Sequence, residues 1–107
     1  MKLKDGMFQV VKDENVTITI KSSFDSGNQV VAVLDEDENN DPFNFKVTKN
    51  VGQQHEVRIR VEFIGASTGA HYTIKINGEG AGNEGPFTRF IKINSASNKR
   101  VYNFRVV

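Results

Sequence analysis

The segment from Glu56 to Phe63 constrains the fold of this chain more than any other. Val57, Ile59 and Val61 alternate in it with charged residues. A period of two is the pattern of a β-strand with one buried face and one solvated face. We therefore expect a strand here, with its charged side chains facing solvent.

The rest of the chain has the same character. Val and Ile together number 21, against two Leu, and branched side chains favour strands over helices. No segment of ten residues shows the apolar spacing of a helix. We expect an all-β chain of about eight strands, over residues 7–12, 16–21, 29–34, 43–48, 56–63, 71–77, 87–93 and 101–107.

The short connections between these segments indicate how the strands pair. Parallel strands need long crossovers, which the sequence lacks, so we expect antiparallel pairing. Residues 7–12 and 16–21 are expected to form a hairpin. The predicted fold is a single domain over residues 1–107, a two-sheet antiparallel β-sandwich with an immunoglobulin-like or jelly-roll strand order.

Two of the expected strands depart from simple alternation. Residues 29–34 end in an apolar run, which predicts a central strand covered on both faces. Phe87 and Phe90 are out of phase, which predicts a bulge near Arg89. In the loop 22–28, Phe24 is expected to plug the sandwich.

The composition excludes several classes of protein. The chain has no Cys, so disulfides, thiol catalysis and zinc–thiolate sites are excluded. No apolar run approaches the roughly 18 residues of a membrane-spanning helix. The first residues carry no apolar run of the signal-peptide kind, so we expect no such peptide.

An acidic segment predicts a Ca²⁺ site. Its alternating oxygen donors spell D-x-D-x-N-x-D and are Asp35, Asp37, Asn39 and Asp41. Such donors can converge on one hard cation. The pattern matches the start of an EF-hand loop but departs from it later, where Asn40 replaces Gly and Lys46 replaces Glu. A looser Ca²⁺ site, which would favour an extracellular or cell-surface location, and a solvated acidic turn both remain open.

Basic residues concentrate in the second half of the chain. Residues 1–54 have a net charge of −3 and residues 55–107 a net charge of +4. Arg58, Arg60 and Lys75 are expected to point outward as a ligand-binding face for phosphates, sulfated glycans or carboxylates. Further cations that could join this face are Arg89, Lys92, Arg100 and Arg105. A nucleic-acid partner is not expected, because the aromatic residues fall on the inward phase. The alternative is an ordinary solvated sheet surface.

The remaining motifs carry little chemistry. The glycine-rich segment 78–85 precedes a strand, which excludes a phosphate loop and predicts a long mobile hairpin loop. His55 and His71 lack the spacing of zinc ligands, and we expect both at the surface. A sandwich of this size leaves little room for a cleft once its core is filled. We therefore expect no enzymatic activity.

The segment Tyr72–Gly78, with the sequence YTIKING, resembles a late strand of bacterial pre-peptidase C-terminal domains. The chain is also broadly similar to small immunoglobulin-like accessory domains. These resemblances imply an accessory β-sandwich. We expect a non-catalytic binding or adhesion module with a carbohydrate or protein ligand, bound through loops 22–28, 35–42 and 78–85, with Ca²⁺ as the candidate cofactor. The alternative is a self-associating structural subunit of a coat, appendage or scaffold.

Overall fold

The computed structural model of the chain describes residues 1–22, 28–63, 71–80, 82–92 and 97–107. These residues form nine β-strands and include no helix that is long and apolar enough to cross a membrane. Phe24 and most of the loop 22–28 lie outside the described residues. The strands are β1 (Lys2–Lys4), β2 (Met7–Val10), β3 (Asn15–Ser22), β4 (Asn28–Leu34), β5 (Asn44–Lys46), β6 (Gln54–Phe63), β7 (His71–Gly78), β8 (Phe87–Lys92) and β9 (Ser97–Val106).

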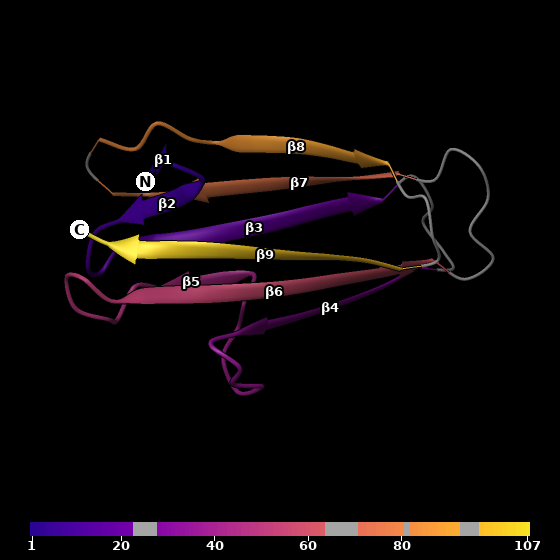
Figure 1. The fold of residues 1–107 in the computed structure, drawn as a ribbon, viewed down its shortest axis with the longest axis horizontal. Coiled ribbons are helices and arrows are strands. Elements are labelled where there is room, and N and C mark those ends of the chain that lie inside the picture. The colour runs from indigo at the N-terminus through magenta and orange to yellow at the C-terminus, as the bar shows by residue number, and fades with distance from the viewer. Residues whose placement is uncertain (23–27, 64–70, 81, 93–96) are drawn as a thin grey trace.

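The strands form two sheets that pack into a sandwich (Figure 1). The five-stranded sheet has the order β1-β2-β9-β6-β4, and the four-stranded sheet has the order β5-β3-β7-β8. From β2 to β7 each successive strand belongs to the other sheet, so most connections cross the sandwich. The predicted two-sheet β-sandwich is confirmed.

One strand pair departs from the antiparallel prediction. β2 runs parallel to β9, with Phe8 opposite Phe104. The lack of long crossovers does not exclude this pair, because nearly the whole chain lies between the two strands and serves as their connection. The first and last regions of the domain are therefore joined side by side.

The predicted hairpin of residues 7–12 with 16–21 is wrong, because β2 and β3 lie in different sheets. β2 instead pairs with β1, with Lys4 opposite Met7. Asp5 and Gly6 between them have φ values of 54° and 76°. An Asp-Gly pair with positive φ is the preferred two-residue hairpin turn. This hairpin covers only one end of the sandwich, where both termini also lie (Figure 1).

The core lies between the sheets and uses the inward residues of the alternating strands. On β6, Val57, Ile59 and Val61 are buried, whereas Arg58 and Arg60 are exposed. The other central strands behave in the same way. Their buried residues are Val16, Ile18, Tyr72, Ile74, Ile76, Phe104 and Val106.

β4 lies at an edge of the five-stranded sheet, so the prediction of a central strand is wrong. Within the described residues its one strand partner is β6. Val31 and Val33 face outward and are half-buried, directly opposite Arg60 and Arg58. The long aliphatic stems of Arg can cover neighbouring apolar surface. An apolar strand is thereby tolerated at an edge.

The predicted bulge in β8 is also wrong. β8 pairs with β7 in continuous register from Phe87 to Lys92. Phe90 points outward, is 54% exposed, and has its ring centroid 4.7 Å from that of His71. The two Phe residues are out of phase because they occupy opposite faces. Arg89 therefore lies on the inward face of the strand.

Glu14 is a buried carboxylate that explains several of the glycines in segment 78–85. It bonds the terminal ammonium of Met1 at 2.9 Å and accepts the N–H groups of Val11 at 3.1 Å and Gly80 at 2.8 Å. A Cβ atom on Gly80 would lie 2.6 Å from the carboxylate, so a larger residue there would collide with it. The predicted β7–β8 hairpin is confirmed, and described residues of its loop pack around Glu14.

Burial alone raises the pKa of Glu14. The hydrogen bond and charge of the terminal ammonium, together with the N–H groups of Val11 and Gly80, outweigh burial and hold this pKa below 4.5. The carboxylate is therefore charged at neutral pH and joins the first residues to the glycine-rich segment.

Candidate functional site

The acidic segment begins with a tight turn directly after β4. Asp35 and Glu36 both have positive φ, 55° and 60°. The N–H of Asp37 donates to the carbonyl of Leu34 at 3.0 Å and closes the turn. A positive φ costs a residue other than glycine of order 1–2 kcal/mol. The turn therefore needs contacts that hold it in place.

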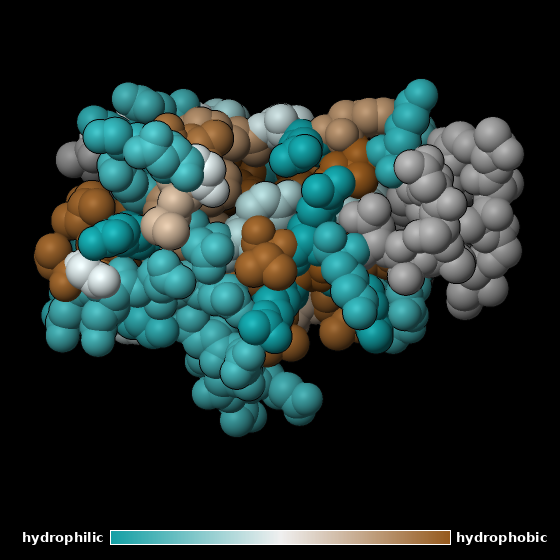
Figure 2. Space-filling view, viewed as in Figure 1, coloured by the Kyte–Doolittle hydropathy of each residue, from teal (hydrophilic) through white to brown (hydrophobic). Residues whose placement is uncertain are grey.

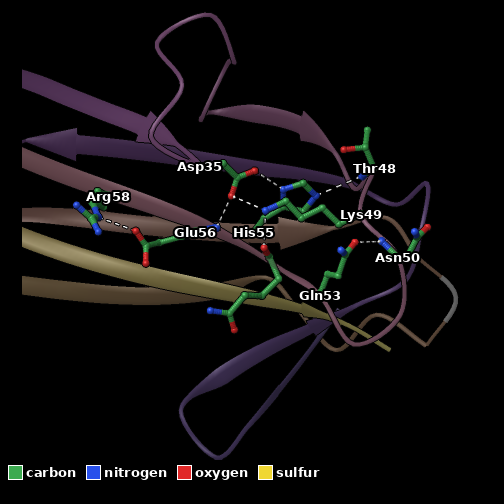
Figure 3. A network of polar contacts seen from close by, with 9 residues as sticks. Asp35, Thr48, Lys49, Asn50, Gln53, His55, Glu56 and Arg58 are labelled. Carbon is green, nitrogen blue, oxygen red and sulfur yellow. Dashed lines mark hydrogen bonds and ion pairs between the residues drawn. The ribbon is translucent and has the colours of Figure 1, made fainter.

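The side chain of Asp35 supplies these contacts (Figure 3). Its Oδ1 accepts the N–H of Glu56 at 2.8 Å, and its Oδ2 lies 2.6 Å from Nδ1 of His55. The N–H of Thr48 donates to Nε2 of His55 at 3.2 Å. Because Nε2 accepts a hydrogen bond, the proton of the neutral ring resides on Nδ1 and points at Asp35. His55 is 3% exposed, so the prediction of a surface histidine is wrong for this residue.

The electrostatics of this network favour the charged form of Asp35. Burial raises the pKa of Asp35, but the N–H of Glu56, the imidazole of His55 and the charge of Lys49 lower it by more, to below 3.8. Lys49 Nζ lies 3.5 Å from the carboxylate and donates to the carbonyl of Gln54 at 2.9 Å. The network thus fastens the turn after β4 to the start of β6.

Two other predicted metal ligands, Asp37 and Asp41, accept backbone N–H groups of their own segment. Asp37 Oδ1 accepts the N–H of Asn39, and Asp41 Oδ1 accepts the N–H of Phe43, both at 2.9 Å. Asp35, Asn39 and Asp41 line a hollow of about 290 Å³. Among the described residues no three acidic or histidine side chains are placed to hold one metal ion. The Ca²⁺ site stays a prediction.

The three cations predicted to bind a ligand do not form one face. Arg58 and Arg60 lie on β6 and point out of the five-stranded sheet. Lys75 lies on β7 and points out of the four-stranded sheet. These outer faces are on opposite sides of the sandwich, so the predicted grouping is wrong. The prediction failed because β6 and β7, although consecutive, belong to different sheets.

Both arginines of β6 already have acidic neighbours. Arg58 lies 3.0 Å from Glu36 and 2.6 Å from Glu56, and Arg60 lies 3.2 Å from Glu62. These groups are exposed, and such pairs contribute little to stability. They agree with the alternative of a solvated sheet surface.

A cleft opens between the two sheets beside the β1–β2 hairpin. β2 has four residues, and the chain turns at Gly6, while β7 and β8 continue past the hairpin (Figure 1). The inner face of β7 and β8 is therefore less covered there. The cleft has a volume of about 310 Å³, and its apolar lining consists of Leu3, Phe8, Ile74, Ile76 and Phe87. Figure 2 shows apolar side chains between hydrophilic groups on this part of the surface. The expectation that so small a sandwich leaves little room for a cleft is wrong.

Two arginines and a tyrosine bring polar groups to the same region. Arg89 and Tyr102 line the cleft. Arg89 lies opposite Ile74 in the register and Arg100 lies opposite Ile59, so both occupy the inward phase of their strands. Arg100 is half-buried there, whereas Arg89 stays exposed where it lines the cleft. The suggestion that these two arginines join an outward cationic face is therefore wrong.

The hydroxyls of Tyr72 and Tyr102 share this environment. Burial raises the pKa of both, and the charges of Arg100 and Arg89 act on both hydroxyls in the opposite direction. The guanidinium of Arg100 also hydrogen-bonds the Tyr72 hydroxyl. Both tyrosines are therefore neutral at physiological pH, and each hydroxyl carries its proton.

Strand phase would have located these arginines from the sequence. Arg89 is in phase with Phe87 and Ile91, and Arg100 is in phase with Tyr102 and Phe104. An arginine in the apolar phase of a strand points toward the core. Charge alone, taken as a sign of exposure, suggests the outer face for both.

Comparisons with known proteins found no matching family model, curated protein or solved structure.

Proposed function

We propose that this chain is a non-catalytic binding module that holds a small apolar ligand in the cleft between its sheets. The observation that carries the proposal is the cleft itself, about 310 Å³ with walls from both sheets. Small-molecule sites typically measure roughly 300–1,000 Å³ and combine apolar walls with a few polar groups. This cleft has both properties, since Arg89 and Tyr102 accompany its apolar lining.

The state of His55 supports binding rather than catalysis. A general base needs a nitrogen within reach of the substrate. Here Nε2 accepts the N–H of Thr48 and Nδ1 contacts Asp35. The imidazole is thus used to hold the fold together.

The chemistry of the cleft also bears on the class of ligand. Its walls are aliphatic and phenylalanine side chains, which suit a hydrocarbon group. The predicted carbohydrate ligand has less support, because the chain contains no Trp to stack on a sugar ring. A hydrocarbon ligand is therefore favoured.

The test is isothermal titration of the chain with 1-octanol and octanoate, which share an apolar tail. Leu3 lies opposite the inward Phe8 in the register and is 47% exposed, so Leu3→Trp can narrow the cleft with little risk to the fold. Val51→Trp is the matched control, since Val51 is 73% exposed and outside the cleft lining. We expect at least one probe to bind the wild type and Val51→Trp, and to bind Leu3→Trp more weakly. Failure of both probes, or equal binding to both variants, would contradict the proposal.

A second candidate function, self-association, is favoured by β4. This edge strand has seven residues and carries no charged side chain or proline. Natural edge strands are usually protected by such residues, and an unprotected edge can pair with another chain. The partner we propose is β4 of a second copy. Sedimentation equilibrium should then show a dimer that Val31→Lys abolishes and Thr19→Lys, on the interior strand β3, does not. A monomer at high concentration would contradict this candidate.

A further inference from the structure

The two inward arginines are unusual in their positions. Arg89 lies between Phe87 and Ile91 on the inner face of β8, and Arg100 occupies the matching face of β9. Arg89 is exposed where it lines the cleft, and Arg100 is half-buried. A charge that is partly removed from water is stabilised by an opposite charge. Among the described residues no carboxylate forms an ion pair with either arginine. Positive charge therefore gathers at the cleft without a counter-charge from that part of the chain.

Hydrogen-bond donors at the same place also lack acceptors. The hydroxyl of Tyr102 and Nε of Arg100 are buried, and neither has a partner among the described residues. Buried polar groups in native proteins are nearly always satisfied, so each exception calls for an explanation. Of these two residues Tyr102 belongs to the cleft lining and Arg100 does not. An acceptor oxygen of a ligand in the cleft would therefore serve the Tyr102 hydroxyl.

A carboxylate matches this set of groups. It is acceptor-only, with two oxygens, and it fits the planar fork of a guanidinium. A phenol hydroxyl can donate to it as well. An ammonium head group has only hydrogen-bond donors and would be repelled by the positive charge of Arg89. A neutral alcohol would leave that positive charge without a counter-charge.

We infer that the cleft binds an amphipathic carboxylate of the single-chain fatty-acid type. The apolar tail lies between the hairpin and β8, against Phe8 and Phe87, and the carboxylate lies against Arg89 and the Tyr102 hydroxyl. The charge of Arg100, which also acts on the Tyr102 hydroxyl, adds to the positive charge near the carboxylate. The inference rests on the proposed function and names the ligand class of the same site.

The experiment compares three probes with one tail, namely octanoate, 1-octanol and octylammonium, by isothermal titration at constant ionic strength. Octanoate is expected to bind about tenfold more tightly than 1-octanol, because a hydrogen bond to a charged group contributes on that scale. Octylammonium is expected to bind more weakly than 1-octanol.

Two substitutions locate the effect. Arg89→Gln should remove most of the preference for octanoate over 1-octanol. Arg105→Gln is the matched control, because it removes the same charge from an exposed, outward position of β9 and should keep the preference. Tyr102→Phe keeps the ring, removes only the hydroxyl, and should lower the preference in part.

The possible failures are distinguishable. If octanoate and 1-octanol bind equally and both depend on Leu3, the inference is overturned and the proposed function stands. If no probe binds, both are overturned. If Arg89→Gln and Arg105→Gln reduce octanoate binding equally, the preference reflects overall charge and the inference is overturned.

Discussion

Arg89 of β8 lies directly opposite Ile74 of β7, on the face of the sheet that forms the core. Ile74 is 1% exposed, whereas Arg89 reaches the cleft. A charged residue in an otherwise apolar row breaks the local pattern that specifies the fold. Such exceptions are expected at functional sites. This relationship is the basis of the predictions about the cleft.

The first prediction concerns the cost of that arginine to stability. Arg89→Leu places an apolar side chain in the apolar row and should raise the free energy of unfolding by up to about 1 kcal/mol, as stabilising changes at functional positions often do. Urea unfolding measures it, with Arg105→Leu as the control at an outward position. A clear loss of stability in Arg89→Leu alone would mean that the guanidinium supports the fold rather than a ligand.

The second prediction concerns Glu14 and pH. Its folded-state pKa lies below 4.5, so the unfolded chain binds the proton more readily than the folded chain. The resulting stabilisation is present above pH 4.5 and is lost as the pH falls through the folded-state pKa. At neutral pH, Glu14→Gln should lower the free energy of unfolding by roughly 3 kcal/mol, because it leaves the buried ammonium of Met1 without its carboxylate.

The measurement is urea unfolding from neutral pH to below the pKa of Glu14. The difference between wild type and Glu14→Gln should shrink below pH 4.5. A weaker pH dependence should remain in the variant, because the pKa of Asp35 is lowered as well. Glu84→Gln, an exposed change in the same segment, is the control and should match the wild type. A constant difference across the pH range would contradict the account of Glu14.

Much of the fold follows from local patterns. Alternation identifies β3, β6 and β7, because each has one face in the core and one in water. The edge position of β4 does not follow, since the outward Val31 and Val33 are sheltered by residues of another strand. The parallel pairing of β2 with β9 likewise depends on a contact between residues far apart in sequence.

The sites were harder to predict for a related reason. The spacing of Asp35 and Asp37 predicts oxygen donors on one side of the segment only if its backbone is extended. The backbone is not extended there, because Asp35 and Glu36 form a tight turn. That turn is held by His55, which is distant in sequence. The cleft exists because the short β1–β2 hairpin ends before β8 does. The relative position of two elements so far apart in sequence cannot be predicted from a local residue pattern.

The third prediction separates the two aspartates of the acidic segment. Asp35→Asn should destabilise the chain by about 1–3 kcal/mol, because a buried His55 loses its charged acceptor. Asp37→Asn should have almost no effect, since the Asn side-chain oxygen can still cap the N–H of Asn39. Thermal and urea unfolding of the two variants compare them. Equal losses would mean that Asp35 has no special role in holding the turn.

The fourth prediction concerns Ca²⁺. We expect millimolar Ca²⁺, compared with EDTA, to leave the melting temperature unchanged, because a cation that binds only the folded state would raise it. The reason is that no three acidic or histidine side chains of the described residues are placed to hold one metal ion. A rise of several degrees that Asp37→Ala abolishes would contradict this and restore the acidic segment as a metal site.

The central claim is that the cleft between the sheets binds an amphipathic carboxylate, and the most direct measurement is an amide ¹H–¹⁵N NMR titration of the chain with octanoate. We predict that the largest changes in chemical shift occur at Leu3, Phe8, Phe87, Arg89 and Tyr102, and that they saturate together. Amides on the outer face of β6, such as those of Arg58 and Arg60, should change little. Changes centred on that outer face or on the acidic segment, or no saturable change at all, would contradict the account.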